Sequence, residues 1–216
     1  MPTKPRRPSQ PAAEAAPSTP ARRLRRAERR EQLLAAATRA FARTGYAATG
    51  LDDIATAAGI SRVLLYRHFE SKADLYRAVL NRAVGRLTAA VGTRDYTAAS
   101  IDALLGAAAE DPDGFRLLCR HAVREPEFRQ EMDRFQKGMV ATARREPARI
   151  IPDRTWARWA AQLATVVAIE AVLAWLDAGQ PDPDRAADRI RQALAGVIGA
   201  AQWRGPGARR PAPSPR

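Results

Sequence analysis

Apolar residues recur at helical spacing through most of the chain, separated by Gly, Pro and helix-capping residues. The first such pattern predicts a helix over about residues 24–43, ended by Gly45. Its apolar face comprises Leu33, Leu34, Ala37, Ala40 and Phe41. No convincing strand pattern is found, because the one β-branched cluster, residues 165–167, lies inside a longer helical pattern. The chain is therefore predicted to be all-α.

Two short helices joined by a tight turn are predicted next. Thr49 can cap the free amides of the first helix, and Gly59 ends it. Ser61 caps the second helix, on which Leu65 and Phe69 point inward while polar residues project from the other faces. The arrangement is typical of a helix-turn-helix, whose second helix enters the major groove of DNA.

The remaining pattern predicts a second helical domain. A long helix begins at Lys72 after a Ser71 cap. Looser segments follow near residues 97–110, 112–123 and 127–146, with edges marked by Pro112, Pro126 and Pro147. Two stronger helices, about residues 153–178 and 184–201, close the fold.

These breaks divide the chain into a helix-turn-helix domain over residues 22–87, with the motif itself at about 50–69, and a helical domain over residues 88–203. The Pro-rich segments 1–21 and 204–216 are expected to be disordered tails, since they cannot bury enough apolar surface to offset chain entropy.

The net charge of +13 is concentrated in the first domain. Residues 22–90 hold 14 basic and six acidic residues, a net charge of +8, whereas residues 91–203 hold 15 and 16, a net charge of −1. A basic part joined to a nearly neutral part indicates that one part meets a polyanion. Nucleic acid is favoured over an anionic membrane surface.

Composition argues against several other classes of protein. The single cysteine, Cys119, fits a reducing compartment. The most apolar run, residues 163–176, is shorter than the roughly 20 residues that span a bilayer and contains Glu170, so a soluble cytoplasmic protein with no membrane partner is expected. An enzyme is disfavoured because the chain has two histidines and lacks GxSxG, HExxH and a Gly-rich phosphate loop. No catalytic residue, metal site or cofactor is expected.

Several motifs coincide around the predicted turn. They are Gly45-Tyr46, Ala58-Gly59-Ile60-Ser61, Leu65-Tyr66, His68-Phe69 and Ser71-Lys72. At these spacings residues 27–87 resemble the N-terminal DNA-binding domain of TetR-type transcriptional regulators. The resemblance implies a homodimer that binds double-stranded DNA at a palindromic operator, and more often a repressor than an activator. It also implies a C-terminal domain that binds an unidentified small-molecule ligand and dimerises through the last two helices.

Carried over by position, the resemblance implies four contacts with DNA phosphates: Thr49, Tyr66, His68 and Lys72. Lys72 would act together with the amides at the start of its helix. Ser61, Arg62 and Arg67 lie on the helix that would enter the groove, and the two arginines are candidates for reading guanine. The family often has Gly-Thr where this chain has Val63-Leu64, and Leu64 is a candidate contact for a thymine methyl.

Other features have two interpretations. The arginine-rich segment 22–30 is a basic arm that follows DNA or a solvated helix start, and electrostatic assistance is favoured over specific readout. His121 and Glu170 are candidate ligand contacts, although a satisfied histidine at a helix end and an ion pair with an arginine are favoured over ligand contact. The closing helices fit a dimer interface or an internal core. A helical protein-interaction module with only non-specific DNA binding is the alternative function.

Overall fold

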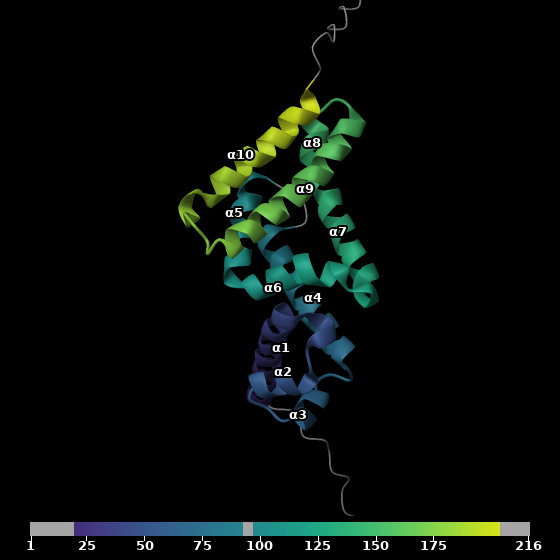
Figure 1. Ribbon diagram of the computed structural model, residues 1–216, viewed down its shortest axis with the longest axis vertical. Helices are drawn as coiled ribbons and strands as arrows, with labels where there is room; N and C mark the ends of the chain where they lie inside the picture. Colours follow the sequence, from purple (N-terminus) through teal and green to yellow (C-terminus); the bar gives the residue numbers. More distant parts are fainter. Residues whose placement is uncertain (1–19, 93–96, 204–216) are drawn as a thin grey trace, which may run out of the picture.

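The computed structural model describes residues 20–92 and 97–203, and the described residues form helices and contain no strand (Figure 1). The all-α prediction is confirmed. The N-terminal helices are α1 (Pro20–Ala48), α2 (Leu51–Ala57), α3 (Arg62–Tyr66) and α4 (Lys72–Val91). The predicted tails lie outside the described residues, except that residues 20 and 21 already belong to α1.

The C-terminal part is built from six α-helices and three short helical turns in the described residues. The helices are α5 (Ala98–Glu110), α6 (Pro112–Arg116), α7 (Arg129–Ala143), α8 (Arg145–Ile150), α9 (Arg154–Asp177) and α10 (Pro183–Gln202). Between α6 and α7 lie η1 (Leu117–His121), η2 (Ala122–Arg124) and η3 (Pro126–Phe128). The sequence pattern missed α8, because Pro147 was expected to mark an edge. Proline is tolerated in the first turn of a helix, where the missing N–H has no intrahelical partner.

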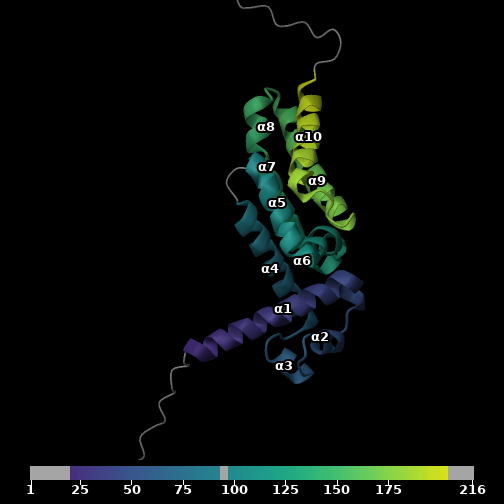
Figure 2. The ribbon, with the colours of Figure 1, turned by 90° about the vertical axis from the view of Figure 1, so that its left-hand side faces the viewer.

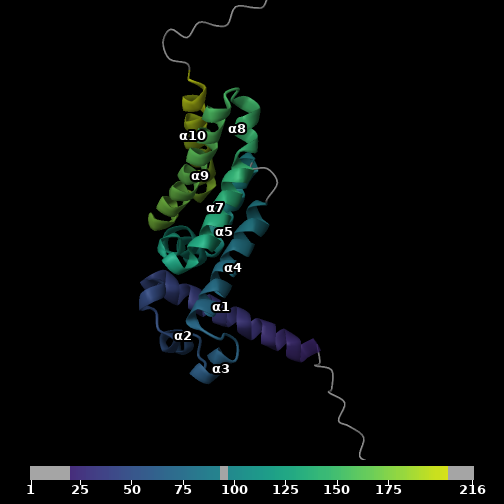
Figure 3. The same ribbon diagram turned by 90° about the vertical axis from the view of Figure 1, so that its right-hand side faces the viewer.

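The long helix α4 connects the two ends of the molecule. Its first half packs against α1, and it then rises beside α5 into the C-terminal part (Figures 1 and 3). Leu75 and Val79 of α4 and Phe41 of α1 are fully buried in a core that extends into the C-terminal helices. Helix α4 therefore crosses the boundary predicted at residue 87 and belongs to both domains.

An aromatic cluster joins the end of α1 to the C-terminal part. Gly45 breaks α1 with φ 77° and ψ 172°, a backbone conformation that residues other than glycine rarely adopt, and turns Tyr46 toward α4. The Tyr46 ring lies 4.8 Å from Tyr76 and 4.9 Å from Phe128, measured between centroids. The predicted stop at Gly45 thus directs the chain into a contact between the two domains.

Helices α9 and α10 pack side by side at the end of the molecule opposite α3 (Figures 1 and 2). The sequence pattern left open whether their apolar residues form a dimer interface or an internal core. In the structure Leu173 of α9 and Ile190 of α10 are buried inside the chain. Trp156, Trp159 and Val166 are exposed instead. The same two helices therefore carry buried apolar residues on one face and exposed apolar residues on another.

Candidate DNA-binding site

Helix α3 is held in place by the turn before it and by two buried side chains. Gly59, with φ 65°, lets the chain reverse after α2, and the Ile60 N–H donates to the Ala55 carbonyl at 3.0 Å. Ser61 caps α3, because its hydroxyl accepts from the Leu64 N–H at 3.3 Å. Leu65 and Phe69 are buried against α1 and α2, as predicted. The opposite face of α3 lies at the outer end of the molecule (Figure 2).

The outward face of α3 carries Arg62, Val63, Tyr66 and Arg67, which are all exposed, and Ser61 is exposed at its start. Val63 is 65% exposed and was not singled out from the sequence, whereas the predicted Leu64 is half-buried. The signal in the sequence was the spacing, since Val63 and Arg67 are four residues apart and share a helical face. The face thus combines cations, a phenol and a methyl-bearing side chain.

Arg62 is already partly ordered in the free protein. Its Nη1 donates to Asp52 Oδ2 at 2.8 Å, its Nη2 lies 3.4 Å from the Tyr66 hydroxyl, and its guanidinium lies 5.6 Å from the centroid of the Tyr66 ring. The hydrogen bond with Tyr66, followed by the charge of Asp52, raises the pKa of Arg62. Arg62 therefore stays charged, but an acid on α2 competes for it.

Lys72 has a structural role beside the predicted phosphate contact. Its Nζ donates to the Ala47 carbonyl at 3.0 Å and lies 4.8 Å from the centroid of the Tyr46 ring. Ser71 caps α4 by accepting from the Asp74 N–H at 3.0 Å. The Asp74 carboxylate, in turn, accepts from the Glu70 N–H at 3.2 Å. Lys72 thus ties the start of α4 to the end of α1, and the Ser71 and Asp74 side chains already accept from two N–H groups beside that start.

The structure corrects the prediction for Thr49. Gly50, rather than Thr49, is the residue before α2, and its N–H donates to Asp53 Oδ2 at 3.1 Å. The Thr49 side chain is 3% exposed, and its hydroxyl donates to the Gly45 carbonyl at 2.6 Å. The reversal of the chain at Gly45 turns Thr49 inward, so its hydroxyl is not presented to a phosphate.

The remaining predicted residues lie near the same surface. His68 is half-buried, with its ring 6.4 Å from that of Phe69. In the arginine-rich segment, Arg29 and Arg30 are exposed, and the Arg30 guanidinium lies over the Phe69 ring at 5.3 Å. The side chains of residues 22–26 lie outside the described residues.

The C-terminal part contains an open cavity of about 530 Å³ lined by residues of six helices. Most of its lining is apolar, including Leu104 of α5, Phe135 and Met139 of α7 and Ile169 of α9. The volume falls within the range typical of small-molecule sites. The cavity also reaches the end of α4 through Leu87, Thr88 and Val91.

Neither predicted ligand contact lines this cavity. His121 is half-buried in η1, and Glu170 is exposed on the outward face of α9. Both were selected because their sequence neighbours are apolar, but one step along a helix turns a side chain by about 100°. The cations at the cavity are Arg134, whose Nε donates to the Gln130 carbonyl at 3.2 Å, and Arg191, which pairs with Asp102 at 2.8 Å.

Four large apolar side chains are exposed along or beside α9 and α10, three on α9 and one just after the end of α10. Trp156, Trp159, Val166 and Trp203 are 49%, 39%, 54% and 74% exposed, and the first two rings lie 5.5 Å apart. Within the described ranges, α9 alone is long and apolar enough to cross a membrane by length and composition, and 28% of its most apolar window is buried. A second protein or a bilayer would cover such a face.

Comparisons with known proteins agree with the geometry of the N-terminal domain. The family model described as "Bacterial regulatory proteins, tetR family" matches residues 33–79. The transcriptional activator FasR of Mycolicibacterium smegmatis is 41% identical over 97 residues, which cover 41% of this chain and 44% of FasR. The match therefore spans less than half of FasR.

Solved structures share the fold over most of the chain. A TetR-like transcriptional regulator from Rhodococcus sp. RHA1 has a TM-score of 0.65 and 21% identity, and the match covers 79% of this chain and 96% of that one. FadR from Bacillus subtilis, solved in complex with stearoyl-CoA, has a TM-score of 0.58 and 18% identity, with 78% and 97% covered. At these identities the likeness establishes the fold alone.

Proposed function

Since the chain belongs to the TetR family of bacterial regulatory proteins, we propose that it is a cytoplasmic homodimer that binds a palindromic operator and represses transcription. A small molecule releases the dimer from this operator. The observation that carries the proposal is the outward face of α3. Its two arginines suit guanine edges, and Val63 suits a thymine methyl. A face that had lost DNA binding would not need to expose these groups together.

The proposed contacts follow from position and exposure. Arg62 and Arg67 read bases, and Val63 takes the role first assigned to Leu64. Tyr66 at the end of α3 and Lys72 at the start of α4 contact phosphates, and these contacts fix the register of α3 in the groove without reading sequence. His68 is proposed as a further phosphate contact, and Ser61 orients the start of α3 as its cap.

We assign the exposed face of α9 and α10 to a second copy of the chain rather than to a bilayer. Glu170 and Arg158 are exposed on α9, and charges are costly in a hydrocarbon core. Gly196 and Gly199 are exposed on α10 and permit close approach of a partner helix. A dimer formed here would place its two α3 helices on the same side of the dimer. Each could then enter one of two successive major grooves of the operator, which are about 34–36 Å apart.

The cavity is the proposed ligand site. Its apolar lining suits a long apolar body, and Arg134 at its wall suits an anionic or polar end. A fatty acyl compound is our first candidate, in line with stearoyl-CoA bound to FadR. The ligand must prefer a conformation that does not bind DNA, since only a difference in affinity shifts the equilibrium.

Selection of bound fragments from random duplex DNA at about 0.15 M salt tests DNA recognition, because non-specific binding weakens steeply with salt. Wild type and Val123→Ala, which changes an exposed apolar side chain in η2, are expected to recover one palindromic site. Tyr66→Ala is expected to lose it. Equal recovery of all sequences by the three proteins would support the interaction-module alternative and overturn the proposal.

Stearoyl-CoA is the first probe of the cavity. It should raise the melting temperature and lower the affinity for the recovered site, because a ligand stabilises the state that it binds. Ala168→Trp, which places an indole into the cavity from α9, should abolish both effects while DNA binding persists. If wild type shows neither effect, an acyl ligand is rejected, and the DNA assignment is unaffected.

The sign of regulation is tested with a reporter gene under the recovered operator. Its expression should rise when the protein is absent, whereas a fall in expression would show an activator, as FasR is named.

A further inference from the structure

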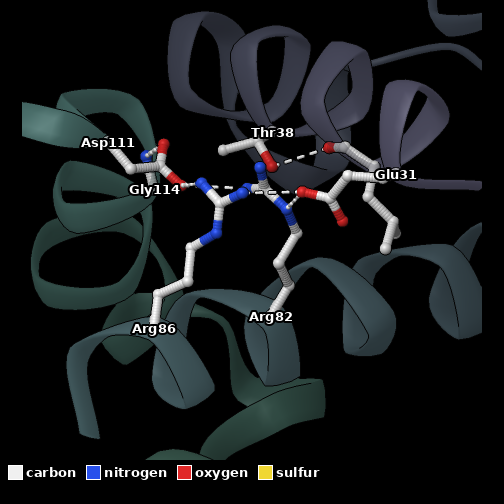
Figure 4. Close-up of polar contacts among 7 residues, drawn as sticks. Glu31, Thr38, Arg82, Arg86, Asp111 and Gly114 are labelled. Carbon is white, nitrogen blue, oxygen red and sulfur yellow. Dashed lines mark hydrogen bonds and ion pairs between the residues drawn. The ribbon is translucent and has the colours of Figure 1, made fainter. Parts of the chain in front are cut away.

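Four charged side chains meet where α1, α4 and the start of α6 converge. Figure 4 shows Arg82 and Arg86 of α4 side by side, with Glu31 of α1 on one side and Asp111 on the other. Arg82 lies 2.7 Å from Glu31 and 2.9 Å from Asp111. Arg86 lies 2.7 Å from the same Glu31 oxygen and 3.2 Å from the same Asp111 oxygen. Each arginine therefore bridges the DNA-binding domain to the C-terminal domain.

The cluster is partly shielded from solvent, and one of its two acids, Asp111, is held in place. The Arg82 and Asp111 side chains are 11% and 19% exposed. Asp111 caps α6 by accepting from the Gly114 N–H at 3.0 Å, and a Cβ at position 114 would lie only 2.7 Å from its carboxylate. Because Asp111 is fixed by this cap, the arginines are anchored to a defined point of the C-terminal domain.

A second contact holds the opposite face of α4. Arg77 lies 3.4 Å from Glu131 and 3.7 Å from Glu127, next to the aromatic cluster around Phe128. Arg77 and Arg86 are nine residues apart, and at about 100° per residue they point in opposite directions from the helix. Rotation of the DNA-binding domain about α4 would therefore break contacts on both sides.

We propose that Arg82, together with Arg86, positions the DNA-binding domain on the C-terminal domain and thereby sets the spacing between the two α3 helices of the dimer. The inference rests on the proposed dimeric function. Arginine is required because its planar fork donates in two directions at once, from Nε to Glu31 and from Nη1 to Asp111. Arg82 is thus a positioning residue that does not touch DNA.

Spacing selectivity is the property that separates positioning from simple stabilisation. One inserted base pair rotates a half-site by about 34° and moves it by about 3.4 Å, so a rigid dimer cannot engage both halves. Wild type and variants are titrated by fluorescence anisotropy against the recovered site, against versions with base pairs added or removed at its centre, and against a single half-site. The principal variant is Arg82→Met, which keeps the apolar stem and removes the fork.

The matched control is Arg116→Met. Arg116 lies 3.1 Å from Asp177, so this variant removes the same charge and an ion pair within the C-terminal domain alone. Glu31→Gln is a second test variant, because Glu31 is 49% exposed and contacts both arginines. Circular dichroism tests whether each variant is folded. If Arg82→Met is not folded, Glu31→Gln alone tests the positioning role.

Wild type and Arg116→Met should lose about tenfold in affinity for one inserted base pair, whereas Arg82→Met and Glu31→Gln should lose less than about threefold. All four should bind the half-site equally. Folded test variants that keep the wild-type spacing profile would overturn the positioning role. Wild type without a preferred site, or without any spacing preference, would instead show that the proposed dimeric function is wrong.

Discussion

Removing the acid that holds Arg62 in the free protein should strengthen DNA binding. Arg62 lies 2.8 Å from Asp52, and their side chains are 55% and 69% exposed. A guanine accepts two hydrogen bonds from one guanidinium, so Arg62 has to give up this pair when it reads a base. In the proposed complex Asp52 would also place a negative charge near the phosphates. Asp52→Asn removes both effects and keeps the size of the side chain.

The expected gain is small and can be separated from the general charge effect. Exposed ion pairs contribute little, so the share due to Arg62 is about two- to fivefold in affinity. Asp53→Asn is the matched control, because the neighbouring carboxylate accepts from Gly50 at 3.1 Å and carries the same charge. The difference between the two variants isolates the competition for Arg62.

The assay is anisotropy at fixed salt with the recovered site and with a version in which the guanine is replaced. Asp52→Asn should bind the recovered site more tightly than Asp53→Asn does and should keep the preference for guanine. Weaker binding, or a lost preference, would refute the reasoning. It would show that Asp52 orients Arg62 for reading rather than competing for it.

Three further predictions concern two buried residues, Tyr76 and Thr49, and the half-buried Cys119. Tyr76→Phe should raise the free energy of unfolding in urea by about 1 kcal/mol, because the Tyr76 hydroxyl is fully buried without a hydrogen-bond partner among the described residues; a less stable variant would show that the hydroxyl is satisfied. Thr49→Val should lose about 1 kcal/mol of stability with unchanged DNA affinity, and the reverse pattern would make Thr49 a phosphate ligand. Burial, followed by the charge of Glu170, raises the pKa of Cys119 to about 12, so a thiol reagent at pH 8 should label the folded protein far more slowly than the unfolded one. The stabilisation that this raised pKa gives is present below about pH 9 and is lost as the pH rises toward 12, so Cys119→Ala should flatten the alkaline fall in stability. Equal labelling of the folded and unfolded protein would contradict the raised pKa.

Local rules were sufficient to predict the helix-turn-helix. Ser61 caps α3, Gly59 makes the turn, and Leu65 and Phe69 face the core, because each of these depends on neighbours within a few residues. The exposure of Val63 follows from the same periodicity. Thr49 was predicted wrongly as a cap, since the direction of its side chain depends on how the chain reverses at Gly45.

The cavity and the charged cluster could not be predicted from the sequence. Six helices line the cavity, and their relative positions depend on long-range packing rather than on periodicity. Arg134 and Arg191 therefore looked like ordinary solvated residues, and His121 and Glu170 were selected instead. Arg82 meets Glu31 and Asp111, which are 51 and 29 residues away, and no local pattern links them.

The claim that α3 reads the operator is tested most directly by the base preferences of two variants. Affinities of wild type, Arg62→Ala and Lys72→Ala are measured for the recovered site and for every single base-pair substitution in one half-site. Arg62→Ala should lose its preference at one base pair, about 1–3 kcal/mol of discrimination there, whereas Lys72→Ala should weaken binding to every sequence alike and lower the salt slope by about one. A uniform loss in both variants would contradict the assignment of Arg62 to base reading.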